Sequence, residues 1–327
     1  MKQFYKFPSI ESFHHKVKAG KKYFVGNRTY NIKPKLHGTN AGIVYHPTEG
    51  VYAQSRKRVI NVDNDNMGFA KFVDSLDTSI YNDSGKVVVL YGEWAGQGIQ
   101  SKDAITKIDR KIFAPFAAVV FASDGETPVS VKTDTADVRN VVEAAGLSDH
   151  PDVVVIDTID TIDINFNGTE DEIQQVVDTL NEKIEEYEKV DTWVRDVFGV
   201  EGPGEGFVVT PSTTEYDEFY NWSFKIKTQA HAVNKSSKSV VAKAEASKDV
   251  IDFVDRFVTE PRLEQAVSEL GGDDEMDMKK MGDFLKWMAQ DIKKESEDEL
   301  EASGLEWKTV SKHITTKSRL WFMNRYK

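Results

Sequence analysis

The sequence has no cysteine among its 327 residues, which excludes disulfide bonds and metal sites built on thiolate ligands. It also lacks any apolar run approaching about 18 residues, and its N-terminus has no apolar segment of the signal-peptide type. Repeats and low-complexity tracts are absent as well. From these absences we expect a soluble, cytoplasmic protein. The hydrophobic content of 39% is enough for one large core or two ordinary ones.

Acidic residues outnumber basic ones, 54 to 42, but the two kinds are unevenly distributed along the chain. The net charge of −12 argues at first against a nucleic-acid partner. Residues 134–205 carry 20 acids and 4 bases, whereas residues 225–248 and residues 305–327 each carry 6 bases and 1 acid. The sequence is therefore compatible with a local basic face that binds phosphates.

The hydrophobic pattern predicts two domains. Residues 1–233 contain apolar runs typical of buried strands, such as Ile112–Phe121, where Pro115 indicates an edge strand or a bulge. The small polar residues of 234–244 predict a linker, and residues 245–327 show helical spacing. We expect an α+β domain, a linker and a helical C-terminal domain.

One long helix is expected late in the first domain. Thr169–Glu172 has the sequence of a capping box. Apolar residues follow at helical spacing, so we predict an amphipathic helix that continues to about Val197.

The stretch Lys33–Asn40 places a lysine between two predicted strands. A lysine on such a connection is held by a rigid scaffold and remains open to a ligand. The Gly-Thr-Asn after it suits a tight turn near a phosphate. Taken alone, this short pattern also fits an ordinary surface hairpin.

Other charged residues end or line predicted strands, namely Arg56, Glu93, Glu205, Lys225 and Lys227. Each alone is typical of a solvated surface, but together they suit nucleotidyl transfer. A lysine attacks phosphorus only as the neutral amine, which is about one molecule in a thousand of ordinary lysine at neutral pH. Neighbouring cations favour the neutral amine and neutralise phosphoryl oxygens. Arginine grips phosphate in a bidentate fashion, and glutamates suit Mg²⁺.

These residues resemble the motifs of the covalent nucleotidyltransferases, which comprise DNA ligases, RNA ligases and mRNA capping enzymes. Six stretches carry the resemblance and stand in the family's order: Lys35–Asn40, Ser55–Arg56, Leu90–Glu93, Phe113–Val120, Glu205–Val209 and Phe224–Lys227. Further details, notably His37, Asn40 and the stretch Gly96–Gln100, resemble the bacteriophage RNA ligase 2 branch, the double-stranded RNA ligases.

The resemblance implies the fold and the activity. It implies an α+β fold, with an ATP-grasp-like nucleotidyltransferase (adenylation) domain of antiparallel sheets and helices and a small all-helical C-terminal domain that engages RNA. The implied activity is ATP-dependent sealing of 3′-hydroxyl/5′-phosphate breaks in RNA through lysyl-AMP, with nicked duplex RNA or bridged ends as substrate. It also implies Mg²⁺ or Mn²⁺, a monomer, a role in RNA repair and, for a phage protein, the host cytoplasm.

The resemblance also implies roles for individual residues. Lys35 would accept AMP, Phe116 would stack on adenine, and Glu93 would hold the ribose. The implied catalytic residues are Lys35, His37, Lys225 and Lys227. The implied nucleotide-binding residues are Lys35, Leu36, Asn40, Arg56, Glu93, Phe116, Glu205, Lys225 and Lys227, and the implied metal-binding residues are Glu205 and Glu93.

Several alternatives stay open at the level of sequence. Ala117 stands where the branch often has an acid, so Phe113 is an alternative to Phe116 for stacking. Glu201 competes with Glu205 as the second glutamate. A DNA ligase, a GTP-using capping enzyme and a catalytically inactive nucleic-acid-binding module are rival functions, although no C-terminal β-barrel is indicated for the first two.

Overall fold

A computed structural model describes residues 2–20, 25–78, 85–122, 124–228, 244–296, 299–300, 303 and 305–326. The chain divides into two compact units. The first comprises Met1–Val62 and Phe69–Thr228, and the second comprises Asp63–Gly68 and Gln229–Lys327. The short segment Asp63–Gly68 therefore groups with the C-terminal helices, although no pattern in the sequence predicts this. Most of the predicted linker, 234–243, lies outside the described residues.

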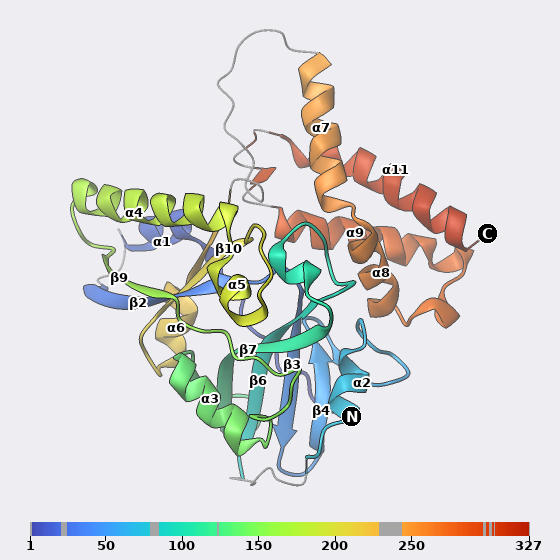
Figure 1. The fold of residues 1–327 in the computed structure, drawn as a ribbon. Coiled ribbons are helices and arrows are strands. Elements are labelled where there is room, and N and C mark those ends of the chain that lie inside the picture. Colours follow the sequence, from blue (N-terminus) through green and yellow to red (C-terminus); the bar gives the residue numbers. More distant parts are fainter. Residues whose placement is uncertain are drawn as a thin grey trace. The chain divides into compact units, whose positions relative to one another are not determined.

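The first unit contains two sheets (Figure 1). The five-stranded sheet has the order β1 (Glu11–Ser12), β11 (Phe224–Lys227), β10 (Gly206–Pro211), β2 (Asn27–Lys35) and β9 (Asp160–Asn165). Here β1 pairs in parallel with β11, and the other neighbours are antiparallel.

The six-stranded sheet is antiparallel throughout its described pairs, in the order β5 (Val59–Ile60), β4 (Gly50–Ser55), β3 (Thr39–His46), β6 (Val87–Gly96), β7 (Lys111–Phe121) and β8 (Pro128–Lys132). Antiparallel sheets with helices confirm the predicted α+β class. The chain crosses from one sheet to the other between β2 and β3, so the residues just after Lys35 join the two sheets.

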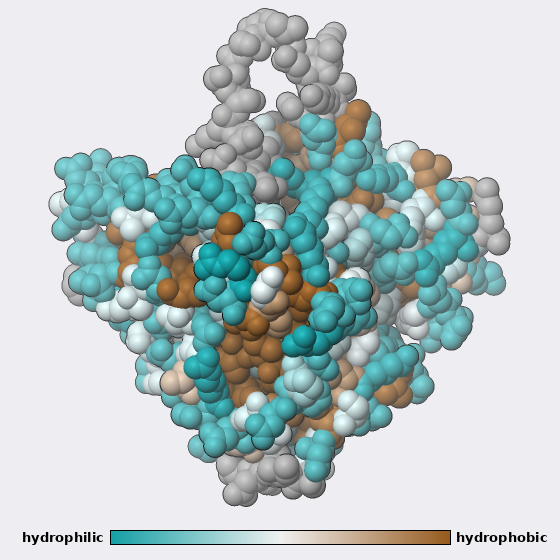
Figure 2. All heavy atoms as spheres, in the orientation of Figure 1, coloured by the Kyte–Doolittle hydropathy of each residue, from teal (hydrophilic) through white to brown (hydrophobic). Residues whose placement is uncertain are grey.

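Short helices flank these sheets: α1 (Phe13–Gly20), α2 (Phe69–Asp74), η1 (Ala104–Lys107), α3 (Thr135–Ala144) and α6 (Tyr216–Trp222). Side chains alternate along β2, so Tyr30 and Ile32 point into a core that also contains Leu180 and Ile184 of the long helix α4 (Glu170–Lys189). On the face drawn in Figure 2, hydrophilic side chains cover α4, and hydrophobic ones gather over β6 and β7.

The single helix predicted from Thr169 to about Val197 is wrong, because two helices occupy this region. The capping box forms as predicted at Thr169 and Glu172. Helix α4 ends at Lys189, where Val190 adopts an extended conformation. The Asp191 carboxylate then accepts a hydrogen bond from the Val194 backbone N–H and caps α5 (Thr192–Phe198). An aspartate that caps a new helix interrupts the old one, although the apolar spacing continues.

Pro115 produces a β-bulge rather than an edge strand. Strand β7 lies between β6 and β8. Gly92 pairs with Pro115 and Tyr91 pairs with Ala117, so Phe116 is the extra residue on β7. Proline cannot donate to the ladder, and bulges next to functional sites redirect a side chain. The bulge therefore sets the direction of Phe116.

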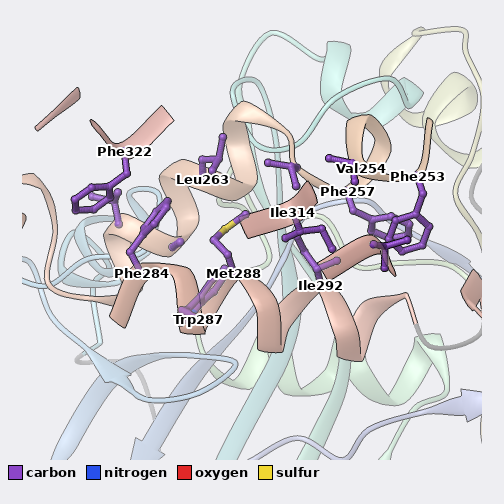
Figure 3. Close-up of a cluster of buried hydrophobic side chains, with 14 of the residues drawn as sticks. Phe253, Val254, Phe257, Leu263, Phe284, Trp287, Met288, Ile292, Ile314 and Phe322 are labelled. Atoms are coloured by element: carbon purple, nitrogen blue, oxygen red, sulfur yellow. The ribbon is translucent and has the colours of Figure 1, made fainter. Parts of the chain in front are cut away.

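The described part of the second unit is helical apart from Asp63–Gly68 and short connections, with α7 (Ala244–Phe257), α8 (Glu260–Glu269), η2 (Asp273–Glu275), η3 (Met278–Lys280), α9 (Met281–Glu295) and α11 (Trp307–Arg325). Its own core contains Phe253, Phe257, Phe284, Met288 and Phe322. Figure 3 shows Phe284 beside Phe322 at one end of this cluster and Phe253 beside Phe257 at the other, with Met288 between the two pairs. None of the described helices is both long and apolar enough to cross a membrane.

Candidate active site

Lys35 and Lys227 flank a glycine on the five-stranded sheet. Lys35, the last residue of β2, pairs with Gly206 of β10, and Gly206 pairs with Lys227 of β11. Gly206 has φ +152°, and an added Cβ would lie 2.1 Å from the Ile226 carbonyl oxygen. Glycine is therefore required here, and no side chain stands between two lysines whose strands are about 10 Å apart.

A second pair of lysines follows on the same face of this sheet. Val208 pairs with Lys33 on one side and with Lys225 on the other. Directly opposite residues, and residues two apart in a strand, share a face. Lys33, Lys35, Lys225 and Lys227 thus lie on one face of the sheet, where Lys33 is buried and the other three side chains are partly exposed.

Lys35 contacts the glutamate that precedes β10. Its Nζ lies 2.5 Å from Oε1 of Glu205, whose side chain is 6% exposed, whereas that of Lys35 is 22% exposed. Glu201, the competing glutamate, is exposed. The structure therefore brings Glu205 rather than Glu201 to Lys35, and the carboxylate lies within reach of any group that the amine attacks.

The six-stranded sheet contributes a second row of polar residues. Asn40 on β3 pairs with Glu93 on β6, so both side chains share a face, and Arg56 follows the end of β4, the other neighbour of β3. A Cβ at Gly38 would lie 2.4 Å from the Trp94 carbonyl oxygen and 2.8 Å from Cγ of Glu93. The turn after Lys35 therefore packs directly on β6 and brings Glu93 next to it.

Leu36 and His37, in the same turn, have different surroundings. Leu36 is buried with Ala95 and Ile112, so its side chain anchors the turn and leaves only backbone atoms for a nucleotide. His37 is 24% exposed, and its Nδ1 lies 2.5 Å from Oδ2 of Asp103. Nothing in the sequence predicts a role for Asp103, because a lone aspartate in a loop belongs to no recognisable pattern.

The two candidate stacking residues differ in exposure. Phe113 is fully buried, and its ring packs on Phe69 and Phe72 with centroids 5.2 Å and 6.3 Å away. Phe116 is partly exposed and meets Phe7 edge to face at 5.2 Å. Phe116 thus has surface to offer a base, whereas Phe113 has none. Ala117 is buried, so an acid there would have to be desolvated.

Lys33 is a further member of the site that the sequence analysis did not assign. It is 3% exposed, and its Nζ has no hydrogen-bond partner among the residues that the structure describes. Burial lowers the pKa of Lys33 to about 8, although the charges of Asp134 and Asp157 act in the opposite direction. A lysine in a strand normally indicates a solvated edge, so no signal in the sequence predicts its burial.

We expect Lys33→Met to stabilise the protein without ligand by about 3 kcal/mol at pH 7. The unfolded chain binds the lysine proton more tightly, with a pKa of about 10.4. The buried cation therefore destabilises the fold at every pH below about 8, and this cost disappears as the pH rises through 10.4. Urea denaturation of both proteins at pH 7 and pH 10 measures the difference, with Lys86→Met as an exposed control. An equal difference at both pH values would contradict the prediction.

The carboxylates of the site are suited to a cation held mainly by phosphates. No group of three or more histidines, aspartates and glutamates within the described ranges could hold a metal ion alone. Mg²⁺ bound together with a nucleotide typically takes one or two carboxylates and completes its shell with phosphate oxygens and water. Glu205 and Glu93 are the carboxylates that the sequence predicts for such a cation.

A family model described as RNA ligase matches residues 28–227 of the chain, which include all residues of this site. No curated protein matches the chain.

Solved structures of a Naegleria gruberi RNA ligase are similar to the chain at low identity. An apo mutant has 16% identity and a TM-score of 0.45, and the match covers 71% of this chain and 57% of that one. The ligase with PPi has 16% identity and a TM-score of 0.43 over 71% and 58%. A mutant with AMP and Mn has 14% identity and a TM-score of 0.46, again over 71% and 58%. The match thus spans 57% to 58% of the length of these ligases.

Proposed function

The chain belongs to the RNA ligase family, and from this premise we propose that it uses ATP to join a 3′-hydroxyl to a 5′-phosphate in RNA. One observation supports this proposal best. On one face of the five-stranded sheet, Lys35 contacts Glu205, and Lys35 and Lys227 lie on either side of Gly206. An amine, a carboxylate and a second cation are what transfer of AMP from ATP to a lysine needs.

The reaction has three steps. Nζ of Lys35 forms a bond to the α-phosphorus of ATP, and pyrophosphate leaves. An oxygen of the RNA 5′-phosphate then attacks the same phosphorus, and the lysine amine leaves. Finally the 3′-hydroxyl attacks the 5′-phosphate, and AMP leaves. Lys225 and Lys227 would neutralise the phosphoryl oxygens in these steps.

The other residues of the site would hold the nucleotide and the substrate. Phe116 would stack on adenine, Glu93 would bind the ribose, and Arg56 would contact phosphate or ribose. Asn40 would contact the RNA ends or the nucleotide. Glu205 and Glu93 would help to place Mg²⁺, for which Mn²⁺ could substitute; the cation would supply charge neutralisation at the phosphates.

Covalent labelling tests the proposal directly. We expect the protein to become labelled when it is incubated with α-labelled ATP and Mg²⁺, and to stay unlabelled in EDTA or with γ-labelled ATP. Labelling that is equally strong with GTP would favour capping chemistry instead. A protein that takes no label from either nucleotide would contradict nucleotidyl transfer and would favour an inactive binding module.

We propose nicked duplex RNA as the substrate, in line with the resemblance to the bacteriophage RNA ligase 2 branch. We also propose that the protein is a monomer that acts in RNA repair in the cytoplasm, which for a phage protein is that of the host. A-form duplexes display 2′-hydroxyls in a wide minor groove that proteins read. Replacing ribose by deoxyribose at the last two positions on the 3′-hydroxyl side of a nick should therefore slow sealing, on the order of tenfold or more. Equal sealing rates for the two nicked duplexes would favour a DNA ligase.

A further inference from the structure

The His37–Asp103 pair places a buried acid against the turn that follows Lys35. The Asp103 side chain is 2% exposed, whereas that of His37 is 24% exposed, and Oδ2 lies 2.5 Å from Nδ1. The Asp103 carboxylate is thus buried, whereas the His37 ring remains partly exposed to solvent. This asymmetry is expected when a carboxylate serves a histidine that works on a ligand.

The backbone around Asp103 is fixed from two directions. The Ala104 N–H donates to the Pro203 carbonyl at 2.9 Å, two residues before Glu205. The Gln100 side-chain amide donates to the Gly38 carbonyl at 3.4 Å, in the turn that contains His37. Asp103 also occupies the N-cap of η1, but its side chain makes no capping hydrogen bond there. Helix capping, the usual role of an aspartate at an N-cap position, therefore does not explain Asp103.

A carboxylate that accepts a hydrogen bond from Nδ1 determines the state of the imidazole. The shared proton must lie on Nδ1, so the neutral ring keeps its lone pair on Nε2. The same contact fixes the ring orientation and stabilises the cation that forms when Nε2 takes up a proton. The pair therefore has the chemistry of a general base held by a carboxylate.

The reaction proposed above uses two protic nucleophiles at one site, the Lys35 amine and the RNA 3′-hydroxyl. The Lys35 amine already has Glu205 as a carboxylate partner at 2.5 Å. We propose, on the basis of the proposed function, that His37 is the general base for the 3′-hydroxyl in the sealing step and that Asp103 is its positioning residue.

The O3′–H proton moves to Nε2 of His37 while O3′ forms a bond to the phosphorus of the adenylylated 5′ end. The bond from that phosphorus to the oxygen of AMP breaks, and AMP leaves with the electron pair. Nε2 then releases its proton to water, and the Asp103 carboxylate stays ionised throughout.

Sealing of a nicked duplex that already carries AMP on its 5′-phosphate isolates this step, because neither ATP nor Lys35 labelling is needed. In single turnover at saturating RNA, we expect His37→Gln to reduce the sealing rate at least 100-fold, within the range of general-base catalysis. Asp103→Asn, which keeps the shape but not the charge, should reduce it about 10- to 100-fold. Affinity for the nicked duplex and labelling of Lys35 are measured in parallel on both variants, so that a slower sealing step is distinguished from weaker RNA binding or weaker uptake of AMP.

Two further measurements separate positioning from a structural role. In the His37→Gln background, Asp103→Asn should have no additional effect on sealing, because coupled residues are not additive. Nitrogen-15 spectra of the histidines should show a protonated Nδ1 on His37 in the wild type and a loss of this tautomer in Asp103→Asn. Asp109→Asn, an 89% exposed acid nearby in the chain, is the control.

The outcomes distinguish this proposal from the proposed function. If the wild type seals the adenylylated nick and Asp103→Asn seals it equally fast, the proposal is overturned and the ligase function stands. Additive losses in the double variant, or an unchanged His37 tautomer, would also overturn it. Failure of the wild type itself to take up AMP or to seal would instead count against the ligase function.

Discussion

Lys35→Ala should abolish covalent labelling by α-labelled ATP. The structure places the Lys35 amine on the face of the five-stranded sheet that carries the four lysines, 2.5 Å from the Glu205 carboxylate, where it would form the bond to phosphorus. Lys35→Arg should fail as well, since a guanidinium stays protonated and is a poor nucleophile. The loss should exceed 1000-fold, because the covalent intermediate cannot form on another group. Labelled protein counted after denaturing electrophoresis measures it.

A matched variant controls for general damage. Lys86→Ala removes an exposed lysine that precedes β6 and should label like the wild type. Both Lys35 variants should still seal a nick whose 5′-phosphate already carries AMP, because that step does not use the amine as a nucleophile. Normal labelling of either Lys35 variant would refute the proposed mechanism.

Truncation near Asn234 should separate labelling from sealing. All residues assigned to nucleotide transfer lie in the first unit, which ends at Thr228. We therefore expect the truncated protein to accept AMP from ATP but to lose most sealing of nicked RNA, on the order of 100-fold, through weaker RNA binding and slower transfer to the 5′-phosphate. Labelling and sealing are measured on one preparation, with circular dichroism to verify folding. If the helices instead stabilise the first unit, both activities should disappear together.

Ion pairs reduce the set of basic residues in the C-terminal segment 305–327 (the tail) that can contact RNA. Lys317 is paired with Asp255, and Arg325 is paired with Glu264 and Asp273. Lys308, Lys312 and Arg319 are exposed, and at 100° per residue they lie within about 40° of one another on α11. This face of α11 is therefore the better candidate for phosphate contacts, whereas Lys327 lies outside the described residues.

A charge reversal tests this face in the full-length protein. The double variant Lys312→Glu with Arg319→Glu should weaken RNA binding more than tenfold at low salt and reduce the salt dependence of binding. Labelling of Lys35 should be unchanged. Lys286→Glu, the same reversal on an exposed position of α9, serves as the control. Undiminished sealing by a folded truncated protein would refute the role of the tail altogether.

Secondary-structure elements that depend on neighbouring residues could be predicted from the sequence. Alternating and continuous apolar runs predicted the strands, and the capping box at Thr169 formed as expected. The hypothesis of nucleotidyl transfer also came from local features, because a lysine, two glutamates and a lysine pair each end or line a predicted strand. These signals are local, since they depend on the period of the backbone and on the kinds of side chain.

Which of these residues are in contact and which are buried depends on the tertiary fold. His37 and Asp103 are 66 positions apart, and Lys35 and Glu205 are 170 apart. Such contacts are set by strand order and register, which the hydrophobic period leaves open. The burial of Lys33 and the break between α4 and α5 likewise depend on what packs nearby. Desolvation and pairing act between segments distant in the chain, so a local pattern cannot contain them.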